Sequence, residues 1–325
     1  MSRLVKLQSR LRKGEALLLG SADGFDANAH YYFGWEEMGA FLVTRNEAFA
    51  FTREAFGGAN WTKINKFSRR QLPAFLAEHK VKRLLFDEYS AIAPAALRQA
   101  SGIKLMPSAE KMLEQRVVKD AEELGRIRKA QDITKKCVAR ILEKGIYGKT
   151  DNVVAGLLEL EARECGVALN SFEPIVLVNE EARKPHGEPS NRPICKGDLV
   201  LIDVGAVYKR YHGDYSSTLY EGKNEEIRRA IAAVKEAKAA AERKAKPGVK
   251  GSALTKAALA VLKERGFEKT SFKQAGLSLG HHVGLDVHEG RRLDDATLRK
   301  GMAFTIEPGV YAARYGVRFE DVKIL

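Results

Sequence analysis

The chain has 325 residues, of which 45% are hydrophobic and 30% charged, so it can bury a substantial core in one large domain or two. Its apolar stretches are too short to cross a membrane, and its three cysteines include no CxxC pair, which argues against a disulfide framework and a zinc knuckle. The formal net charge of +13 allows an acidic partner, but basic residues alternate with acidic ones along the chain, so we expect no nucleic-acid partner.

The N-terminal segment is basic, and its apolar part is too short and too charged for a signal peptide. We therefore expect a cytoplasmic protein with no membrane partner. Strand-like and helix-like pieces then alternate up to residue 115, with strands expected over 15–20, 39–44, 47–52 and 83–88, and helices over 61–79 and 93–101. That alternation predicts a small α/β domain over residues 1–115.

A second domain is expected over residues 116–325. It opens with a long amphipathic helix over 116–145, in which apolar residues recur at helical spacing. Further helices are expected over 152–165, 224–248 and 251–265, and a strand over 174–179.

A hairpin with two aspartates lies between these helices. Asp203 follows four aliphatic residues of a strand-like run, and Asp214 follows the polar link 209–213 that leads into a second strand. Two carboxylates facing each other in an apolar setting need a cation, a shared proton or hydrogen-bond donors. The alternative of exposed loop acids suits Asp214, beside a glycine, better than Asp203.

A second hairpin-like unit closes the chain. Its strand-like segments 303–311 and 316–325 carry Glu307 and Glu320, and helices precede it as they precede the first hairpin. This order indicates an internal ααββ duplication. Between the units lies LGHHVGLDVHEG, with His281 and His288. Four acids and one histidine suit Mn²⁺, Co²⁺, Fe²⁺ or Zn²⁺, and carboxylates shared by two such ions favour hydrolysis.

Four segments of the chain resemble the ordered metal motifs of the pita-bread metallopeptidase family: IDVGAVYKRYHGD, GHHVGLDVHEG, TIEPGVY and VRFED. The family includes methionine aminopeptidase, aminopeptidase P and Xaa-Pro dipeptidase (prolidase). The stretch DANAHYYFGW is similar to one in the creatinase-type N-terminal domain of the last two. The resemblance implies an α+β protein with a C-terminal pita-bread catalytic domain and a smaller N-terminal α/β domain of creatinase type.

The resemblance also implies a set of metal ligands. Asp203 would bind one ion, Asp214 and Glu320 would bridge two, and His281 and Glu307 would hold the second. The cofactors would be two divalent ions, Mn²⁺ or Co²⁺ first, with Fe²⁺ or Zn²⁺ as alternatives. Glu307 or Glu320 would also move a proton.

Other residues are implied to act around the metals. His288 would donate a hydrogen bond to the scissile carbonyl, and His186 would contact substrate. Arg292, or the arginine before it, would pair with the substrate carboxylate. Arg318 and Thr218 would hold the metal-binding carboxylates in place without binding the metals themselves. A core role for either histidine, or a surface ion pair for either arginine, is the alternative.

The function implied by the resemblance is metal-dependent hydrolysis of the bond before proline in Xaa-Pro dipeptides. The separation of the last two acids resembles that of the prolidase branch, whose members are commonly homodimers. Three alternatives stay open. These are an aminopeptidase P-like enzyme for longer peptides, a metal-free creatinase-like hydrolase of a small non-peptide, and a catalytically silent binding module. The five intact ligands argue against the last two.

Overall fold

The structure of the chain is a computed structural model that describes residues 2–21, 25–36, 39–51, 61–63, 71–86, 103–107, 114–167 and 171–325. The chain forms two compact units, Met1–Arg116 and Val117–Leu325. The boundary expected after residue 115 therefore lies after Arg116. None of the helices in the described ranges reaches the length and apolar content that crossing a bilayer requires.

The first unit contains a six-stranded sheet in the order β4-β3-β2-β1-β5-β6. Its strands are β1 (Glu15–Ser21), β2 (Gly39–Thr44), β3 (Ala48–Phe51), β4 (Thr62–Lys63), β5 (Arg83–Phe86) and β6 (Lys104–Pro107), and its helices are α1 (Arg3–Arg10), α2 (Ala27–Phe33) and α3 (Leu72–Glu78). Buried side chains of β1, β2, β3 and β5 pack against α3 in one apolar cluster. The unit is therefore the mixed α/β layer that the alternating pattern predicts.

The helix expected over 61–79 is wrong at its start. Thr62 and Lys63 pair in parallel with β3, and the helix α3 begins only at Leu72, with a proline in its first turn. Backbone pairing with a neighbouring strand outweighs local helix propensity here. The helix expected over 93–101 lies outside the described residues.

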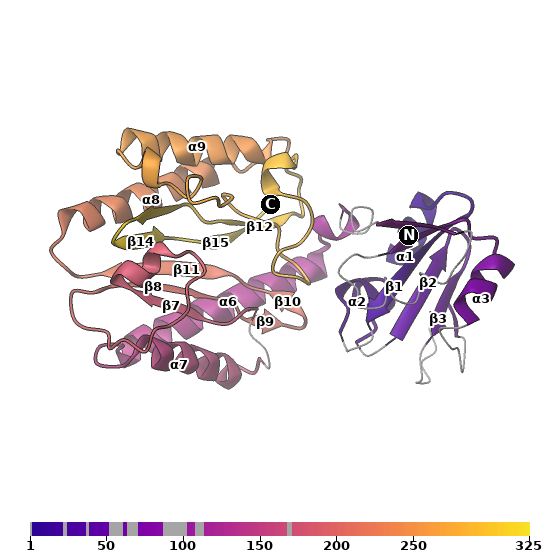
Figure 1. The fold of residues 1–325 in the computed structure, drawn as a ribbon, viewed down its shortest axis with the longest axis horizontal. Coiled ribbons are helices and arrows are strands. Elements are labelled where there is room, and N and C mark those ends of the chain that lie inside the picture. The colour runs from indigo at the N-terminus through magenta and orange to yellow at the C-terminus, as the bar shows by residue number, and fades with distance from the viewer. Residues whose placement is uncertain are drawn as a thin grey trace. The chain divides into compact units, whose positions relative to one another are not determined.

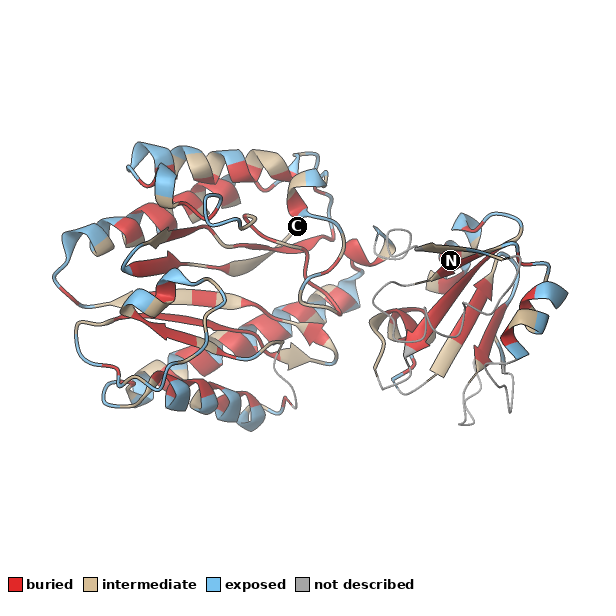
Figure 2. Cartoon of the chain, viewed as in Figure 1, coloured by how far each residue is buried: buried red, intermediate tan, exposed pale blue. Residues whose placement is uncertain are grey.

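The second unit repeats an ααββ plan. Its helices are α6 (Ala121–Lys144), α7 (Asp151–Glu164), α8 (Glu225–Lys244) and α9 (Gly251–Glu264), and its strands are β7 (Ile175–Val178), β8 (Leu199–Val204), β9 (Val207–Tyr208), β10 (Tyr211–His212), β11 (Tyr215–Tyr220), β12 (Ala303–Ile306), β13 (Gly309–Ala312), β14 (Tyr315–Arg318) and β15 (Asp321–Ile324). The strands lie between α6 with α7 on one side and α8 with α9 on the other (Figure 1). Burial concentrates on the strands and on the helix faces turned toward them (Figure 2). The mixed α+β architecture is thus confirmed.

The helix α6 begins later than the pattern suggested. It starts at Ala121 rather than 116, because Asp120 and Glu123 form a capping box at its N-terminus. Residues 114–117 form a separate helical turn, Val118 forms a β-bridge with Met302, and Asp120 is extended. The first residues of the unit are therefore tied to its last strands.

The first hairpin pairs β8 with β11 in antiparallel register, with Asp203 opposite Ser216. The link between them is not a simple loop, since Tyr211 and His212 pair with β9. Gly205 and Gly213 bring the two ends of the link together. A Cβ on Gly205 would lie 2.1 Å from the carbonyl oxygen of Gly213.

The second hairpin is interrupted on both strands. The strand β12 pairs with β15, and β13 pairs with β14, so the ladder breaks between the two pairs. Glu307 lies in one break and Glu320 in the other. A residue at a break is free of the strict alternation of a strand, so both carboxylates can turn toward the first hairpin.

The close approach at Gly205 predicts a stability difference between two glycines. Gly205→Ala should lower the free energy of unfolding by about 1–3 kcal/mol, because the clash is with backbone and the hairpin must shift. Gly156→Ala, in the exposed interior of α7 with no atom near its Cβ, should instead raise it by about 0.5–1 kcal/mol. Urea unfolding of both variants measures the difference. Equal effects would mean that the hairpin tolerates a side chain at 205.

Candidate metal centre

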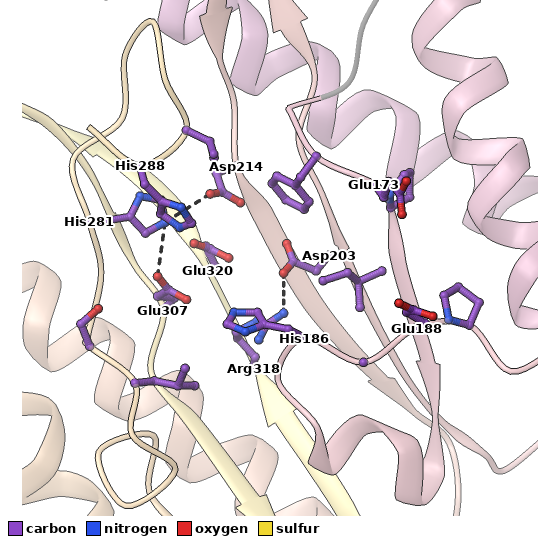
Figure 3. Close-up of a pocket in the computed structure, with 18 residues that line it drawn as sticks. Glu173, His186, Glu188, Asp203, Asp214, His281, His288, Glu307, Arg318 and Glu320 are labelled. Atoms are coloured by element: carbon purple, nitrogen blue, oxygen red, sulfur yellow. Dashed lines mark hydrogen bonds and ion pairs between the residues drawn. The ribbon is translucent and has the colours of Figure 1, made fainter. Parts of the chain in front are cut away.

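All five residues expected to bind metal line one cavity of about 470 Å³ in the second unit: Asp203, Asp214, His281, Glu307 and Glu320. His186, His288 and Arg318 line the same cavity. Figure 3 shows the side chains of His281, Asp214, Glu307 and Glu320 directed toward one another, with Asp203 and Arg318 beside them. The two hairpins and the loop between them thus meet at this point.

The His281 ring is oriented by its own loop. Its Nδ1 lies 3.3 Å from the carbonyl oxygen of His282, which can only accept a hydrogen bond, so Nδ1 carries the proton. The unprotonated Nε2 then faces carboxylate oxygens of Asp214 at 3.4 Å and Glu307 at 3.5 Å. Because Nε2 carries no proton, it cannot donate a hydrogen bond to either carboxylate. This is the arrangement of a histidine that binds metal through Nε2.

Two carboxylate oxygens in the cluster have no hydrogen-bond partner. Asp203 Oδ1 and Glu320 Oε1 are buried, and no donor among the described residues reaches them. Ligand atoms of Asp214, His281 and Glu320 lie within 4.8 Å of one another. Buried oxygens without donors, in a cavity that is also lined by a histidine with an unprotonated nitrogen, fit divalent cations bound by oxygen and one imidazole.

The carboxylates of the cluster repel one another when only protein groups surround them. Burial raises the pKa of Asp214 and Glu320 well above their ordinary values, and the neighbouring carboxylates raise them further. Burial also raises the pKa of Glu307 to about 7. The pKa of His281 falls to about 3, through burial and then through His288. The site therefore disfavours its own anions unless positive charge is supplied.

Arg318 supplies part of that charge. Burial acts to lower the pKa of its guanidinium, but Asp203 and the other acidic groups raise it well above its usual range. Nη2 of Arg318 forms an ion pair with Asp203, Nε donates to Ser216 Oγ, and Nη1 donates to Tyr311 and to the carbonyl of Pro185. One arginine is thus fully engaged beside four carboxylates.

Thr218 acts on the backbone of Arg318 rather than on a carboxylate. Its hydroxyl donates to the carbonyl oxygen of Arg318 at 3.0 Å and accepts from the Arg318 amide at 3.0 Å. Thr218 therefore holds β14 against β11. The sequence pattern had placed it among supporting residues without indicating this backbone contact.

The two further histidines and Arg292 differ in position. His186 and His288 are exposed side chains of the cavity wall, available to a bound molecule. The rings of His281 and His288 meet edge to face, with centroids 4.1 Å apart. Arg292 is also exposed, but it precedes the short helix η4 (Leu293–Asp295) and is not among the residues lining the cavity. The structure therefore does not bring Arg292 to the other site residues.

Three residues that hold the ligands in place were not foreseen. Gln131 of α6 accepts from the Asp214 amide at 2.8 Å and donates to the Asp214 carbonyl at 2.7 Å. The Thr305 hydroxyl accepts from the His281 amide and donates to Glu307. Ser216 donates to Glu320 at 2.9 Å. Ser216 and Thr305 lie in strands that adjoin the candidate ligands Asp214 and Glu307, so the sequence offers a signal for both. Gln131 is distant in sequence and has no such signal.

A buried ion pair fixes the loop that carries His281 and His288. Lys119 Nζ lies 2.6 Å from Glu289 Oε2, and each side chain is only 1% exposed. The second oxygen of Glu289 accepts from the amide of Leu285. His282 is buried on the same loop, and burial, then Lys119, lowers its pKa to about 4, so it stays neutral. Lys119 thus joins the start of the unit to the loop between the two hairpins.

Comparisons with known proteins agree with this geometry. The model of Metallopeptidase family M24 matches residues 125–324. A Xaa-Pro dipeptidase of Pyrococcus furiosus is 36% identical over 215 residues, which are 65% of this chain and 61% of that protein, so the match spans less than two thirds of the relative. The solved prolidase of Pyrococcus horikoshii has a TM-score of 0.88 at 28% identity, covering 100% of this chain and 95% of its own. An X-Pro aminopeptidase of Thermotoga maritima has a TM-score of 0.82 at 26% identity, covering 96% and 92%.

The raised carboxylate pKa values predict how cation removal affects stability. Because the pKa of Glu307 rises from 4.5 to about 7 in the folded protein, the cation-free fold loses stability as the pH rises between these values. Bound cations should offset this loss. The gap in unfolding temperature between Mn²⁺-loaded and EDTA-treated protein should therefore be larger at pH 7.5 than at pH 5. Glu307→Gln should flatten the pH dependence of the EDTA-treated protein, and an equal gap at both pH values would contradict the electrostatic account.

The buried pair of Lys119 and Glu289 predicts a second stability change. Lys119→Met leaves a buried carboxylate without its partner and should cost about 3–5 kcal/mol in guanidinium unfolding. The double variant Lys119→Met/Glu289→Gln should cost less than the single change. Lys263→Met, which removes an exposed ion pair with Glu268, serves as the control and should have little effect. A small loss of stability in Lys119→Met would mean that the ion pair contributes little to the stability of the fold.

Proposed function

The chain belongs to metallopeptidase family M24, and on that premise we propose that it hydrolyses the peptide bond before proline in Xaa-Pro dipeptides, as a prolidase does. One observation carries the proposal. Three buried carboxylates, the partly buried carboxylate of Glu307 and the Nε2 of His281 converge on a cavity whose wall also presents two exposed histidines. The match to a Xaa-Pro dipeptidase supports the choice of substrate class.

Two divalent cations are the proposed cofactors, held by Asp203, Asp214, His281, Glu307 and Glu320. Such a pair lowers the pKa of a bound water and polarises a carbonyl oxygen. The orphaned oxygens of Asp203 and Glu320 support this proposal. Mn²⁺ or Co²⁺ is proposed first, as the family resemblance implies, and Fe²⁺ and Zn²⁺ are the alternatives because the same ligands accept them.

The protein's own groups would divide the work of proton transfer and charge stabilisation. Glu307, with its pKa raised to about 7 by burial, would take a proton from the attacking water and pass it to the leaving nitrogen of proline. His288 would donate a hydrogen bond to the carbonyl oxygen as negative charge develops on it. His186, exposed on the same wall, would contact the substrate. Arg318, braced by Thr218, would hold Asp203 in place and would oppose the rise in the pKa of Asp203 that burial causes.

Arg292 is proposed to pair with the carboxylate of the substrate proline, with Arg291 as the alternative. Both are exposed, so either side chain would have to turn toward the cavity when substrate binds. That movement would be the step that recognises the free C-terminus of a dipeptide.

A second candidate is an aminopeptidase P-like activity on longer peptides. It is favoured because neither Arg291 nor Arg292 is among the described residues that line the cavity, so neither arginine is placed there to meet a substrate carboxylate. The similarity to an X-Pro aminopeptidase supports the same reading. Homodimer formation and a cytoplasmic location are expectations that accompany either activity.

Dipeptide and tripeptide hydrolysis distinguish the two candidates. Metal-stripped protein should release proline from Met-Pro only after Mn²⁺, Co²⁺ or Zn²⁺ is returned, and should leave Met-Pro-Ala intact. Cleavage of the tripeptide would favour the aminopeptidase. Asp203→Asn should abolish turnover, because it removes a ligand charge beside Arg318. Hydrolysis retained in that variant would contradict the proposed ligand set.

His288 has a separate kinetic prediction. His288→Ala should lower kcat by about 10²–10³, with a smaller change in KM, because a hydrogen bond to a developing oxyanion acts mainly in the transition state. Steady-state kinetics on Met-Pro with saturating metal measure both constants. A change confined to KM would instead make His288 a substrate-binding residue.

A further inference from the structure

Two of the three cysteines lie together, away from the metal centre. Cys137 stands in the middle of α6, and Cys165 is the residue that caps the C-terminus of α7. Both belong to one apolar cluster, which also contains Ile133 and Ala162. Cys165 packs against the buried side chains of this cluster, and its side chain interacts with that of Cys137. The packing of α6 on α7 thus places two thiols against each other in the described structure.

The two thiols have different surroundings. Cys137 is buried, whereas Cys165 is partly exposed and can meet small molecules from solvent. Arg140, one turn after Cys137 on α6, places Nη1 3.9 Å from the sulfur of Cys165. The same guanidinium lies 3.3 Å from Glu161, whose carboxylate is also paired with Lys144. A cation therefore stands beside the accessible sulfur of Cys165.

We propose that Cys137 and Cys165 form a reversible disulfide when a hydroperoxide oxidises the partly exposed Cys165. The Cys165 thiolate attacks one peroxide oxygen, the O–O bond breaks, and the other oxygen leaves with a proton as water or alcohol. The Cys137 sulfur then attacks the resulting sulfenic acid, its proton leaves with the hydroxyl as water, and the S–S bond forms. Two thiols are oxidised and one peroxide is reduced, so the step needs no other reactant.

The order of the two cysteines follows from their environments. Burial, and then the neighbouring Cys165, raise the pKa of Cys137 to about 12, so Cys137 keeps its proton while Cys165 reacts. Cys165 is thus the attacking thiol and Cys137 the resolving one.

The bond would join two helices that support the site. On the face of α6 near Cys137, Thr134 accepts a hydrogen bond from the Ala206 amide, and Gln131 holds Asp214. A covalent tie from α6 to the end of α7 restricts the unfolded chain and should raise the unfolding temperature of the oxidised protein.

Thiol counting and peptide mapping test the proposal on the full chain. After treatment with hydrogen peroxide, the protein should keep one of its three thiols, and the disulfide-linked peptides should contain Cys137 and Cys165. Dithiothreitol should restore all three. Cys195→Ser removes the exposed third cysteine and is the matched control, in which the same link should form and no thiol should remain. Cys137→Ala should trap Cys165 as a sulfenic acid that dimedone labels.

Arg140→Gln separates thiolate activation from mere proximity. It should slow the peroxide reaction several-fold, while diamide, a direct thiol oxidant, should still produce the Cys137–Cys165 link. Oxidation of Cys165 to the sulfinic acid with Cys137 left free would overturn the proposal, as would loss of the Cys195 thiol alone. These outcomes are read without peptide hydrolysis, so they do not bear on the proposed peptidase activity.

Discussion

The repulsion among four carboxylates in one buried cluster is the constraint on which the second unit depends. Asp203, Asp214, Glu307 and Glu320 arrive from two hairpins, and apolar clusters surround the strands that carry them. One guanidinium, that of Arg318, cannot neutralise four anions. The remaining carboxylates must either hold protons or bind cations. The raised pKa values of Asp214 and Glu320, and the carboxylate oxygens without hydrogen-bond donors, both follow from this repulsion. A centre that needs positive charge to be stable is at the same time a centre prepared to bind metal.

The surrounding structure keeps these groups in place from outside the cluster. Gln131 holds the backbone of Asp214, Thr305 links His281 to Glu307, and the pair of Lys119 and Glu289 fixes the loop between the hairpins. Ligands set in this way lose little freedom on binding a cation. The exposed His186 and His288 remain free of that framework, which suits groups that must meet a substrate.

The five residues that the sequence marks as candidate ligands line one cavity, and three of them stand out locally in the sequence. Asp203 is a charge at the end of an aliphatic strand, and Glu307 and Glu320 interrupt strands in the same way. The family and the α+β fold expected from these motifs are both confirmed. Gln131 could not be found, since a polar residue on a helix has no mark that it will meet a loop 83 positions away. The start of α3 was misjudged because strand pairing at Thr62 depends on a distant partner, and the position of Arg292 depends on the path of a loop.

Calorimetric titration of metal-stripped protein with Mn²⁺, with proline release from Met-Pro followed on the same samples, tests the central claim most directly. Two cations should bind to each chain, and activity should appear as they bind. Binding of two cations should be lost, together with activity, when Asp214 is changed to Asn. Full hydrolysis by protein that binds no cation, or undiminished binding in the Asp214→Asn variant, would contradict the claim that the carboxylate cluster is the catalytic metal centre.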